Sequence, residues 1–118
     1  RSGIGGSRGR VAMALIEREA RIVNPLGMHA RPAAEFVKTA SRFKSAVFVS
    51  KDGLSVNGKS IMGVMMLAAE KGSSMMIKAE GDDAELAMDA LLALVAAGFN
   101  EMDLTGYETE VEEEEGTA

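Results

Sequence analysis

The stretch that decides the fold is Asn24-Pro25-Leu26-Gly27-Met28-His29-Ala30-Arg31-Pro32-Ala33-Ala34. It contains the single histidine of a chain of 118 residues. Pro25 and Gly27 predict a loop at its beginning, because proline and glycine are the strongest local markers of turns. After His29 the pattern changes to that of a helix.

The predicted helix follows the loop and runs to about residue 43. Its apolar residues recur with the spacing i, i+3, i+4, i+7 of a helix with one buried face, at Ala33, Phe36, Val37 and Ala40. Pro32 suits the first turn of such a helix, where a missing N–H removes no hydrogen bond. We therefore expect His29 at, or just before, a helix N-terminus, with Arg31 two residues farther on.

This position would suit a nucleophile. The first N–H groups of a helix have no carbonyl partner, the helix end carries partial positive charge, and Arg31 adds a full charge. Positive surroundings disfavour the imidazolium ion, so we expect a neutral His29 ring with a free lone pair. The same groups would hold an anion attached to that ring, and a phosphoryl group is the natural candidate. The alternative is a surface or capping histidine without chemistry.

Strands are predicted over residues 17–23, 46–51, 54–56 and 75–80, from β-branched runs and from the turns Asp52-Gly53 and Asn57-Gly58. Helices are predicted over 61–70 and from 82 to about 97. Ser60 suits the N-cap of the first of these helices and Gly72 its C-cap. Asp82 and Glu85 have the spacing of a capping box for the second.

The resulting order, β-α-β-β-α-β-α, indicates an α+β fold. Alternation within the strands favours a sheet that is covered on one face only. A ferredoxin-like arrangement would give the same order of elements, so the periodicity leaves the order of the strands in the sheet open.

Two motifs resemble those of HPr, the histidine-containing phosphocarrier family of the phosphoenolpyruvate-dependent sugar phosphotransferase system. Gly27-Met28-His29-Ala30-Arg31-Pro32-Ala33-Ala34 is similar to the active-site signature of the family. Val56-Asn57-Gly58-Lys59-Ser60-Ile61-Met62-Gly63-Val64-Met65 is similar to its regulatory-serine signature. The resemblance covers about residues 17–101. It implies an open-faced β-sandwich, in which three helices cover one face of a four-stranded antiparallel sheet.

The resemblance also implies a function. His29 would accept a phosphoryl group on Nδ1 from phosphorylated enzyme I and pass it to EIIA-type domains. Arg31 would balance the phosphoryl charge, and the backbone N–H groups of Ala30 and Arg31 would orient its oxygens. Such a protein is a transfer intermediate and not an enzyme, needs no cofactor or metal, and is expected to be a monomer.

The predicted helix over 61–70 begins with a run without polar side chains. Val64, Leu67 and Ala68 can face inward together, which would leave outward-facing residues at Ile61, Met62 and Met65. By resemblance these three would dock the partner proteins, since exposed methionines form an adaptable surface. The alternative is a methionine-rich core. Ser60 would be the phosphorylation site of an HPr kinase/phosphorylase, beside its role as a helix cap.

Composition narrows the remaining functions. Eighteen acidic against 13 basic residues, a net charge of -5, argue against a general nucleic-acid binder. The absence of cysteine excludes disulfides and thiolate metal sites, and a single histidine argues against a transition-metal centre. No apolar run approaches the ~20 residues of a membrane span, and no signal-peptide core is present. We therefore expect a cytoplasmic protein that binds neither membrane nor nucleic acid.

Three regions are expected along the chain. Residues 1–14, rich in Gly, Ser and Arg, are interpreted as a disordered extension, an added leader or a mis-assigned start, with Met13 as the alternative initiator. Residues 15–102 form the HPr-like domain, and 103–118 an acidic disordered tail.

Two other functions stay open. The ending Leu94-Val95-Ala96-Ala97-Gly98-Phe99-Asn100-Glu101 resembles the nitrogen-related paralogue NPr, whose role would be regulatory. The chain could also be an α/β interaction module in which His29 is never phosphorylated. A histidine-dependent hydrolase is disfavoured, since the loop around His29 supplies no carboxylate.

Overall fold

The computed structural model describes residues 14–101, so the predicted tail over 103–118 and the predicted extension, except for Ala14, lie outside the described residues. The elements in chain order are β1 (Ala14–Arg21), α2 (Ala30–Ala40), β2 (Ala46–Lys51), β3 (Leu54–Asn57), α3 (Ile61–Met66), β4 (Ser74–Gly81), α4 (Ala84–Ala96) and the 3₁₀ turn η1 (Gly98–Asn100).

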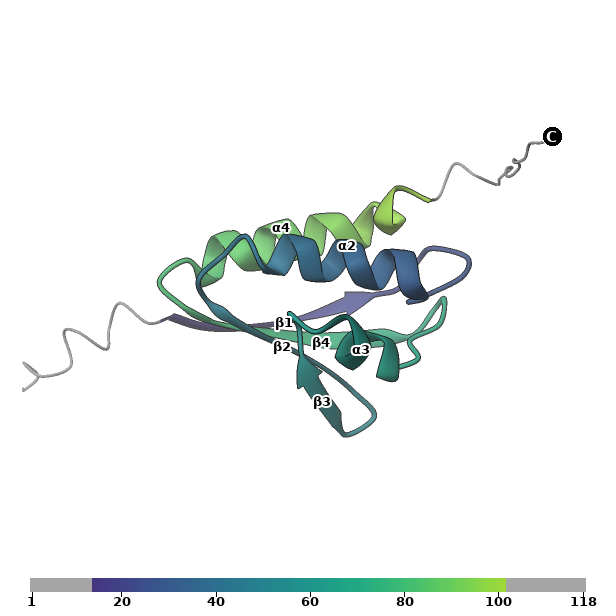
Figure 1. Ribbon diagram of the computed structural model, residues 1–118, viewed down its shortest axis with the longest axis horizontal. Helices are drawn as coiled ribbons and strands as arrows, with labels where there is room; N and C mark the ends of the chain where they lie inside the picture. The colour runs from purple at the N-terminus through teal and green to yellow at the C-terminus, as the bar shows by residue number, and fades with distance from the viewer. Residues whose placement is uncertain (1–13, 102–118) are drawn as a thin grey trace, which may run out of the picture.

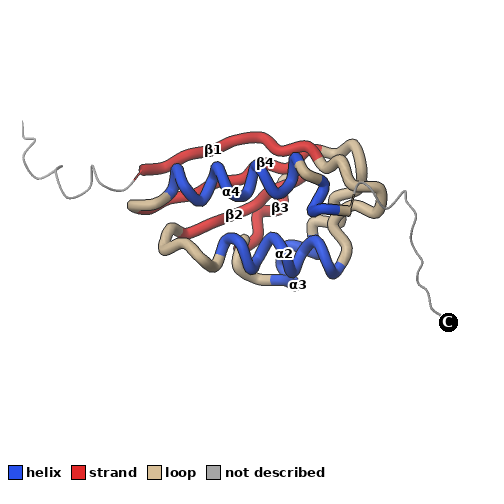
Figure 2. The backbone as a smooth tube through the Cα atoms, turned by 90° about the horizontal axis from the view of Figure 1, so that it is seen from above, coloured by secondary structure: helices blue, strands red, loops and turns tan. Residues whose placement is uncertain are grey.

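The four strands form one antiparallel sheet in the order β1-β4-β2-β3. Helices α2 and α4 lie side by side on one face of the sheet, and α3 lies beside α2 (Figures 1 and 2). The α+β prediction of an open-faced sandwich is confirmed. The pairings also answer the question of strand order, since β1 lies at one edge of the sheet and β4 lies between β1 and β2.

Alternation within the strands produces the one-sided covering. In β4, Met75, Ile77 and Ala79 are buried against the helices, and Met76 between them is exposed. On the open face Lys78 pairs with Phe48 across the strands, and its ammonium lies 5.9 Å from the ring centroid, within the range of a cation–π contact. No helix among residues 14–101 is long and apolar enough to cross a membrane.

The α3 region departs from the prediction at its C-terminal end. The helix ends at Met66 and not near residue 70, so Gly72 is not its C-cap, and Ala68 has the left-handed backbone conformation, with a φ of +50°. Val64 and Leu67 are buried as expected, whereas Ala68 is exposed and Ala69 takes its place in the core. The backbone that follows α3 supports the loop before α2, because the Ala69 carbonyl accepts a hydrogen bond from the Met28 N–H at 2.8 Å.

The bounds of β1 and the start of α4 also differ from the prediction. Strand β1 begins at Ala14, three residues earlier than predicted, and ends at Arg21. The predicted capping box at α4 is wrong, because Asp83 and not Asp82 occupies the N-cap position, and its side chain makes no capping bond. The Asp83 carboxylate instead accepts hydrogen bonds from the backbone N–H groups of Lys44 and Ser45 and from the Ser45 hydroxyl. It thereby joins the α2–β2 connection to the start of α4.

Replacement of Asp83 by Asn is expected to destabilise the protein at neutral pH but not at strongly acidic pH. The hydrogen bond from the Ser45 hydroxyl, followed by that from Lys44, lowers the pKa of Asp83 from 3.8 to about 2. A lowered folded-state pKa stabilises the fold above the unfolded value, and this stabilisation is lost as the pH falls through the folded one. The Tm difference between wild type and Asp83→Asn should therefore shrink from about pH 4 to about pH 2. The neighbouring exposed Asp82→Asn variant is the control, and an equal Tm loss there would contradict the assignment.

Candidate functional site

His29 occupies the N-cap position of α2, at the end of a tightly bonded loop. The Met28 N–H is held by Ala69, and the His29 N–H donates to the Gly27 carbonyl at 3.0 Å. Gly27 has a φ of +69°, a conformation that favours glycine. The His29 side chain makes no capping hydrogen bond, and it is 36% exposed. The loop therefore fixes the backbone and leaves the ring free for other contacts.

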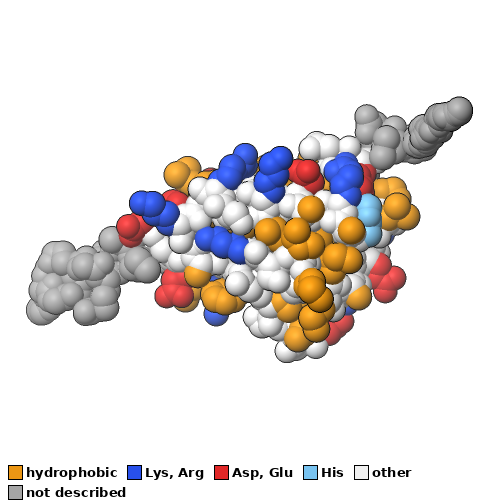
Figure 3. Space-filling model, in the orientation of Figure 1, with side chains coloured by type: hydrophobic (Ala, Val, Ile, Leu, Met, Phe, Trp, Pro, Cys, Tyr) orange, Lys and Arg blue, Asp and Glu red, His pale blue; other side chains and the backbone are white. Residues whose placement is uncertain are grey.

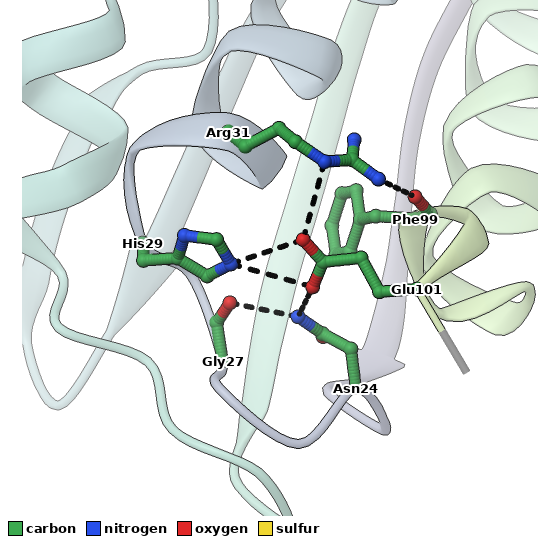
Figure 4. A network of polar contacts seen from close by, with 6 residues as sticks. All are labelled: Asn24, Gly27, His29, Arg31, Phe99 and Glu101. Atoms are coloured by element: carbon green, nitrogen blue, oxygen red, sulfur yellow. Dashed lines mark hydrogen bonds and ion pairs between the residues drawn. The ribbon is translucent and has the colours of Figure 1, made fainter. Parts of the chain in front are cut away.

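The ring of His29 contacts a carboxylate that lies 72 residues farther along the chain. Nε2 lies 3.0 Å from Oε2 and 3.3 Å from Oε1 of Glu101, whose side chain is only 8% exposed. Arg31 Nε lies 3.4 Å from Oε2 of the same carboxylate. Asn24 Nδ2 donates to Glu101 Oε1 at 3.0 Å and to the Gly27 carbonyl at 2.8 Å (Figure 4). Donors from the loop and from α2 thus converge on one buried anion.

A turn at the end of α4 brings Glu101 to this place. Gly98, Phe99 and Asn100 have φ values of +65°, +55° and +64°, and the Phe99 side chain is fully buried. The Phe99 carbonyl accepts a hydrogen bond from Arg31 Nη2 at 3.2 Å. Left-handed conformations cost free energy in residues other than glycine, and they persist where surrounding contacts hold them, often at functional sites.

The surroundings of His29 are therefore not purely cationic, and the expectation to that effect is wrong. Arg31 and the helix end supply positive charge on one side, and Glu101 supplies a carboxylate that the loop itself lacks.

The other ring nitrogen, Nδ1, lies on the side of the ring away from Glu101 (Figure 4). Among the residues that the structure describes, none makes a hydrogen bond to Nδ1. Ala30 and Arg31 are the first two residues of α2, so their N–H groups have no carbonyl partner within the helix. Within residues 14–101, a ring nitrogen without a hydrogen-bond partner and two N–H groups without a carbonyl partner in the helix thus occur in the same helical turn.

Helix α3 carries an apolar surface next to the site. Ile61, Met62, Met65 and Met66, here called the α3 patch, are 43%, 76%, 40% and 64% exposed. Figure 3 shows hydrophobic side chains gathered beside the histidine. The outward orientation predicted for the first three is thus observed, and Met66 is an addition. Ser60 is the N-cap of α3, as predicted, because its hydroxyl accepts a hydrogen bond from the Gly63 N–H at 3.0 Å.

Asn24 and Glu101 are the residues of this site that sequence reasoning missed. Asn24 stands in the loop motif but has no periodic or charge signal, and Glu101 is one of many acidic residues near the C-terminus. Two signals are available: Gly98 ends α4 and allows the chain to turn back toward α2, and Glu101 closes the segment that resembles NPr. Within residues 14–101, no three His, Asp or Glu side chains lie close enough to hold a metal ion.

Comparison with known proteins gives a consistent result. A family model described as the PTS HPr component phosphorylation site matches residues 16–97. The phosphocarrier protein HPr of Cupriavidus necator is 48% identical over 87 residues, which cover 74% of this chain and 98% of the relative. A crystal structure of HPr from Thermoanaerobacter tengcongensis has a TM-score of 0.71 and 49% identity, with 73% of this chain and 97% of that chain covered. A structure described as an HPr dimer from the same organism has a TM-score of 0.58 and 51% identity, over 67% and 91% of the two chains.

Replacement of Gly27 by Ala is expected to displace the loop that carries His29. A Cβ at this position would lie 2.5 Å from the Ala69 carbonyl oxygen, in addition to the strain of a φ of +69°. Gly53→Ala is a matched control, because Gly53 has a φ of +84° but nothing within 4 Å of the added Cβ. Urea denaturation should show a loss of roughly 1–2 kcal/mol for the control and a clearly larger loss for Gly27→Ala. Equal losses would mean that the loop does not depend on its contact with Ala69.

Proposed function

The chain belongs to the HPr family of phosphocarrier proteins, and on this premise we propose that Nδ1 of His29 accepts a phosphoryl group from phosphorylated enzyme I. His29 then passes the group to EIIA-type domains of the phosphoenolpyruvate-dependent phosphotransferase system. The protein is an intermediate in this relay and not an enzyme with a small substrate of its own. Its place of action is the cytoplasm.

The observation that carries this proposal is the position of Nδ1. The ring is 36% exposed, its Nε2 is engaged by Glu101, and Nδ1 lies on the opposite side. A partner protein that reaches Nδ1 therefore breaks no hydrogen bond between this nitrogen and a residue that the structure describes. The unused N–H groups of Ala30 and Arg31 lie in the adjacent helical turn, where a phosphoryl oxygen would accept their hydrogen bonds.

The transfer is an in-line displacement at phosphorus. The lone pair of Nδ1 forms a bond to phosphorus while the bond from phosphorus to the donor nitrogen breaks, and the donor nitrogen recovers its electron pair. Little covalent chemistry remains for the protein, so its contribution is position and charge. The second transfer runs in the opposite direction: the acceptor histidine attacks phosphorus, and Nδ1 of His29 is the leaving group.

The guanidinium of Arg31 is placed to contact a phosphoryl group on His29. Its side chain is 48% exposed, its contact with Glu101 is long at 3.4 Å, and it also donates to the Phe99 carbonyl. Glu101 keeps its contacts with Asn24 and His29 when Arg31 moves, so the half-exposed guanidinium can turn toward a phosphoryl group without leaving the carboxylate unpaired. A phosphoryl group carries more charge than a carboxylate and forms strong paired hydrogen bonds with arginine.

The α3 patch would dock both partners in turn. Ile61, Met62 and Met65 supply flexible apolar contacts beside the ring, as transient binding of different proteins requires. Two partners must reach one nitrogen, so we infer a monomer as the working form, with the ring and patch uncovered. A dimer of the kind described for the relative from Thermoanaerobacter tengcongensis is the competing arrangement.

Ser60 would regulate docking as the site of an HPr kinase/phosphorylase. A phosphate there would add about two negative charges next to the α3 patch. The start of α3 tolerates negative charge, so the effect would fall on the partner and not on the fold.

His29→Ala should abolish phosphorylation. Incubation with enzyme I and labelled phosphoenolpyruvate is expected to label the wild-type protein with an acid-labile, alkali-stable phosphate, as a nitrogen-linked group requires. The variant should remain folded but unlabelled. Label that survives the substitution would reject the site, and a wild type that takes no label would favour the interaction module. Onward transfer to a sugar-branch and a nitrogen-branch acceptor, measured side by side, separates the carrier from the NPr-like role.

Ser60→Asp should weaken binding to enzyme I with little change in the stability of the protein, because aspartate also serves as an N-cap. Ser60→Ala is the matched variant. It should cost ~1 kcal/mol of stability through the lost cap and leave the affinity for enzyme I unchanged. Calorimetric titration with enzyme I measures the affinity, and equal values for wild type and Ser60→Asp would contradict the docking role of α3.

A further inference from the structure

We propose that Glu101, with Asn24 behind it, is a positioning residue that holds the ring of His29 as the tautomer with hydrogen on Nε2. The lone pair of the neutral ring then lies on Nδ1, the nitrogen that faces a visiting partner. The effect on phosphoryl transfer rests on the proposed function, whereas the tautomer assignment does not.

The tautomer follows from the chemistry of the contact. An ionised carboxylate has acceptors only, so a ring nitrogen at hydrogen-bond distance from it must carry the hydrogen. Nε2 lies 3.0 and 3.3 Å from the two oxygens of Glu101. A neutral imidazole has one N–H, so its other nitrogen, Nδ1, has the free lone pair.

Asn24 fixes the carboxylate in turn. Its side chain is fully buried, and Nδ2 donates to both the Gly27 carbonyl and Glu101 Oε1. Both partners are acceptors, so only the amide nitrogen can face them. Among the described residues no donor reaches Asn24 Oδ1, so this amide is buried at the cost of one unsatisfied oxygen. We interpret the cost as tolerated because Asn24 joins the loop backbone to Glu101.

The turn that delivers Glu101 supports a specific role. Three successive residues with positive φ, from Gly98 to Asn100, bring the carboxylate and the Phe99 carbonyl to His29 and Arg31. Phe99 is fully buried, and this anchors the turn. A φ of +55° is costly for a bulky residue, and the buried ring of Phe99 and the contact of its carbonyl with Arg31 hold the turn in this conformation.

Glu101 would also stabilise the ring of His29 after the phosphoryl group has been transferred to it. When the Nδ1 lone pair bonds to phosphorus, the ring keeps its Nε2 hydrogen and gains positive charge, which the carboxylate stabilises. The same division of labour occurs in serine hydrolases, where a buried aspartate orients the histidine and stabilises its charged form. The positively charged ring is the better leaving group in the second transfer.

Nuclear magnetic resonance of the imidazole nitrogens tests the tautomer directly. The chain has one histidine, so labelling with ¹⁵N-histidine gives a single pair of ring signals. In the full-length wild-type protein, at a pH where the ring is neutral, we expect Nε2 as the protonated nitrogen and Nδ1 as the bare one. Glu101→Gln places an amide N–H donor beside Asn24, His29 and Arg31, which are already donors. We therefore expect this variant to populate the tautomer with hydrogen on Nδ1. Glu85→Gln, at an exposed position of α4, should change nothing.

Each outcome is decisive. A wild-type ring protonated on Nδ1, or unchanged signals in Glu101→Gln, would overturn the proposal. If Glu101→Gln does not fold, the wild-type spectrum and the spectrum of Asn24→Ala still test the proposal. We expect Asn24→Ala to show a mixture of the two ring tautomers. The rate of phosphorylation by enzyme I should fall at least ~10-fold in Glu101→Gln. An unchanged rate would contradict the proposed effect of Glu101 on phosphoryl transfer. If wild type took no phosphate at all, the proposed function would fail while the tautomer result stood.

Discussion

One buried carboxylate holds this site together. Glu101 is almost inaccessible to water, and an isolated charge in such a place would be strongly destabilising. It persists because Asn24, His29 and Arg31 surround it with donors from the loop and from the first turn of α2. The removal of one partner from such a group usually costs more than the group contributes as a whole. The ring, the guanidinium and the C-terminal turn therefore constrain one another.

The scaffold explains how residues so far apart in the chain can meet. The one-sided sheet places α2 and α4 side by side, so the start of α2 lies at the same end of the molecule as the end of α4 (Figures 1 and 2). The loop before α2 and the turn after α4 then face each other. A site built in this way needs no deep cavity, which suits chemistry between two proteins.

Much of this arrangement could be predicted from the sequence. Periodicity identified the helices and most strands, and the motif around His29 gave its place at the start of α2. The strand order could not be predicted from periodicity, because it depends on pairings between distant segments, and it followed only from the family resemblance. The end of α3 was missed because Ala68 adopts a conformation that local propensity assigns to glycine, under the influence of contacts with the loop. Glu101 was missed for a related reason: it closes the segment that resembles NPr, but that resemblance indicates no contact with His29, and only the fold brings the two side chains together.

The hydrogen bond from the Met28 N–H to the Ala69 carbonyl has a wider consequence. It connects the segment that bears His29 to the segment that follows α3, and Gly27 packs against the same backbone. The α3 patch and the ring of His29 are thus linked through one set of backbone contacts. If the proposed function holds, a partner that binds the α3 patch is thereby aligned with the imidazole, and we expect binding itself to position the reacting groups, without a separate conformational step.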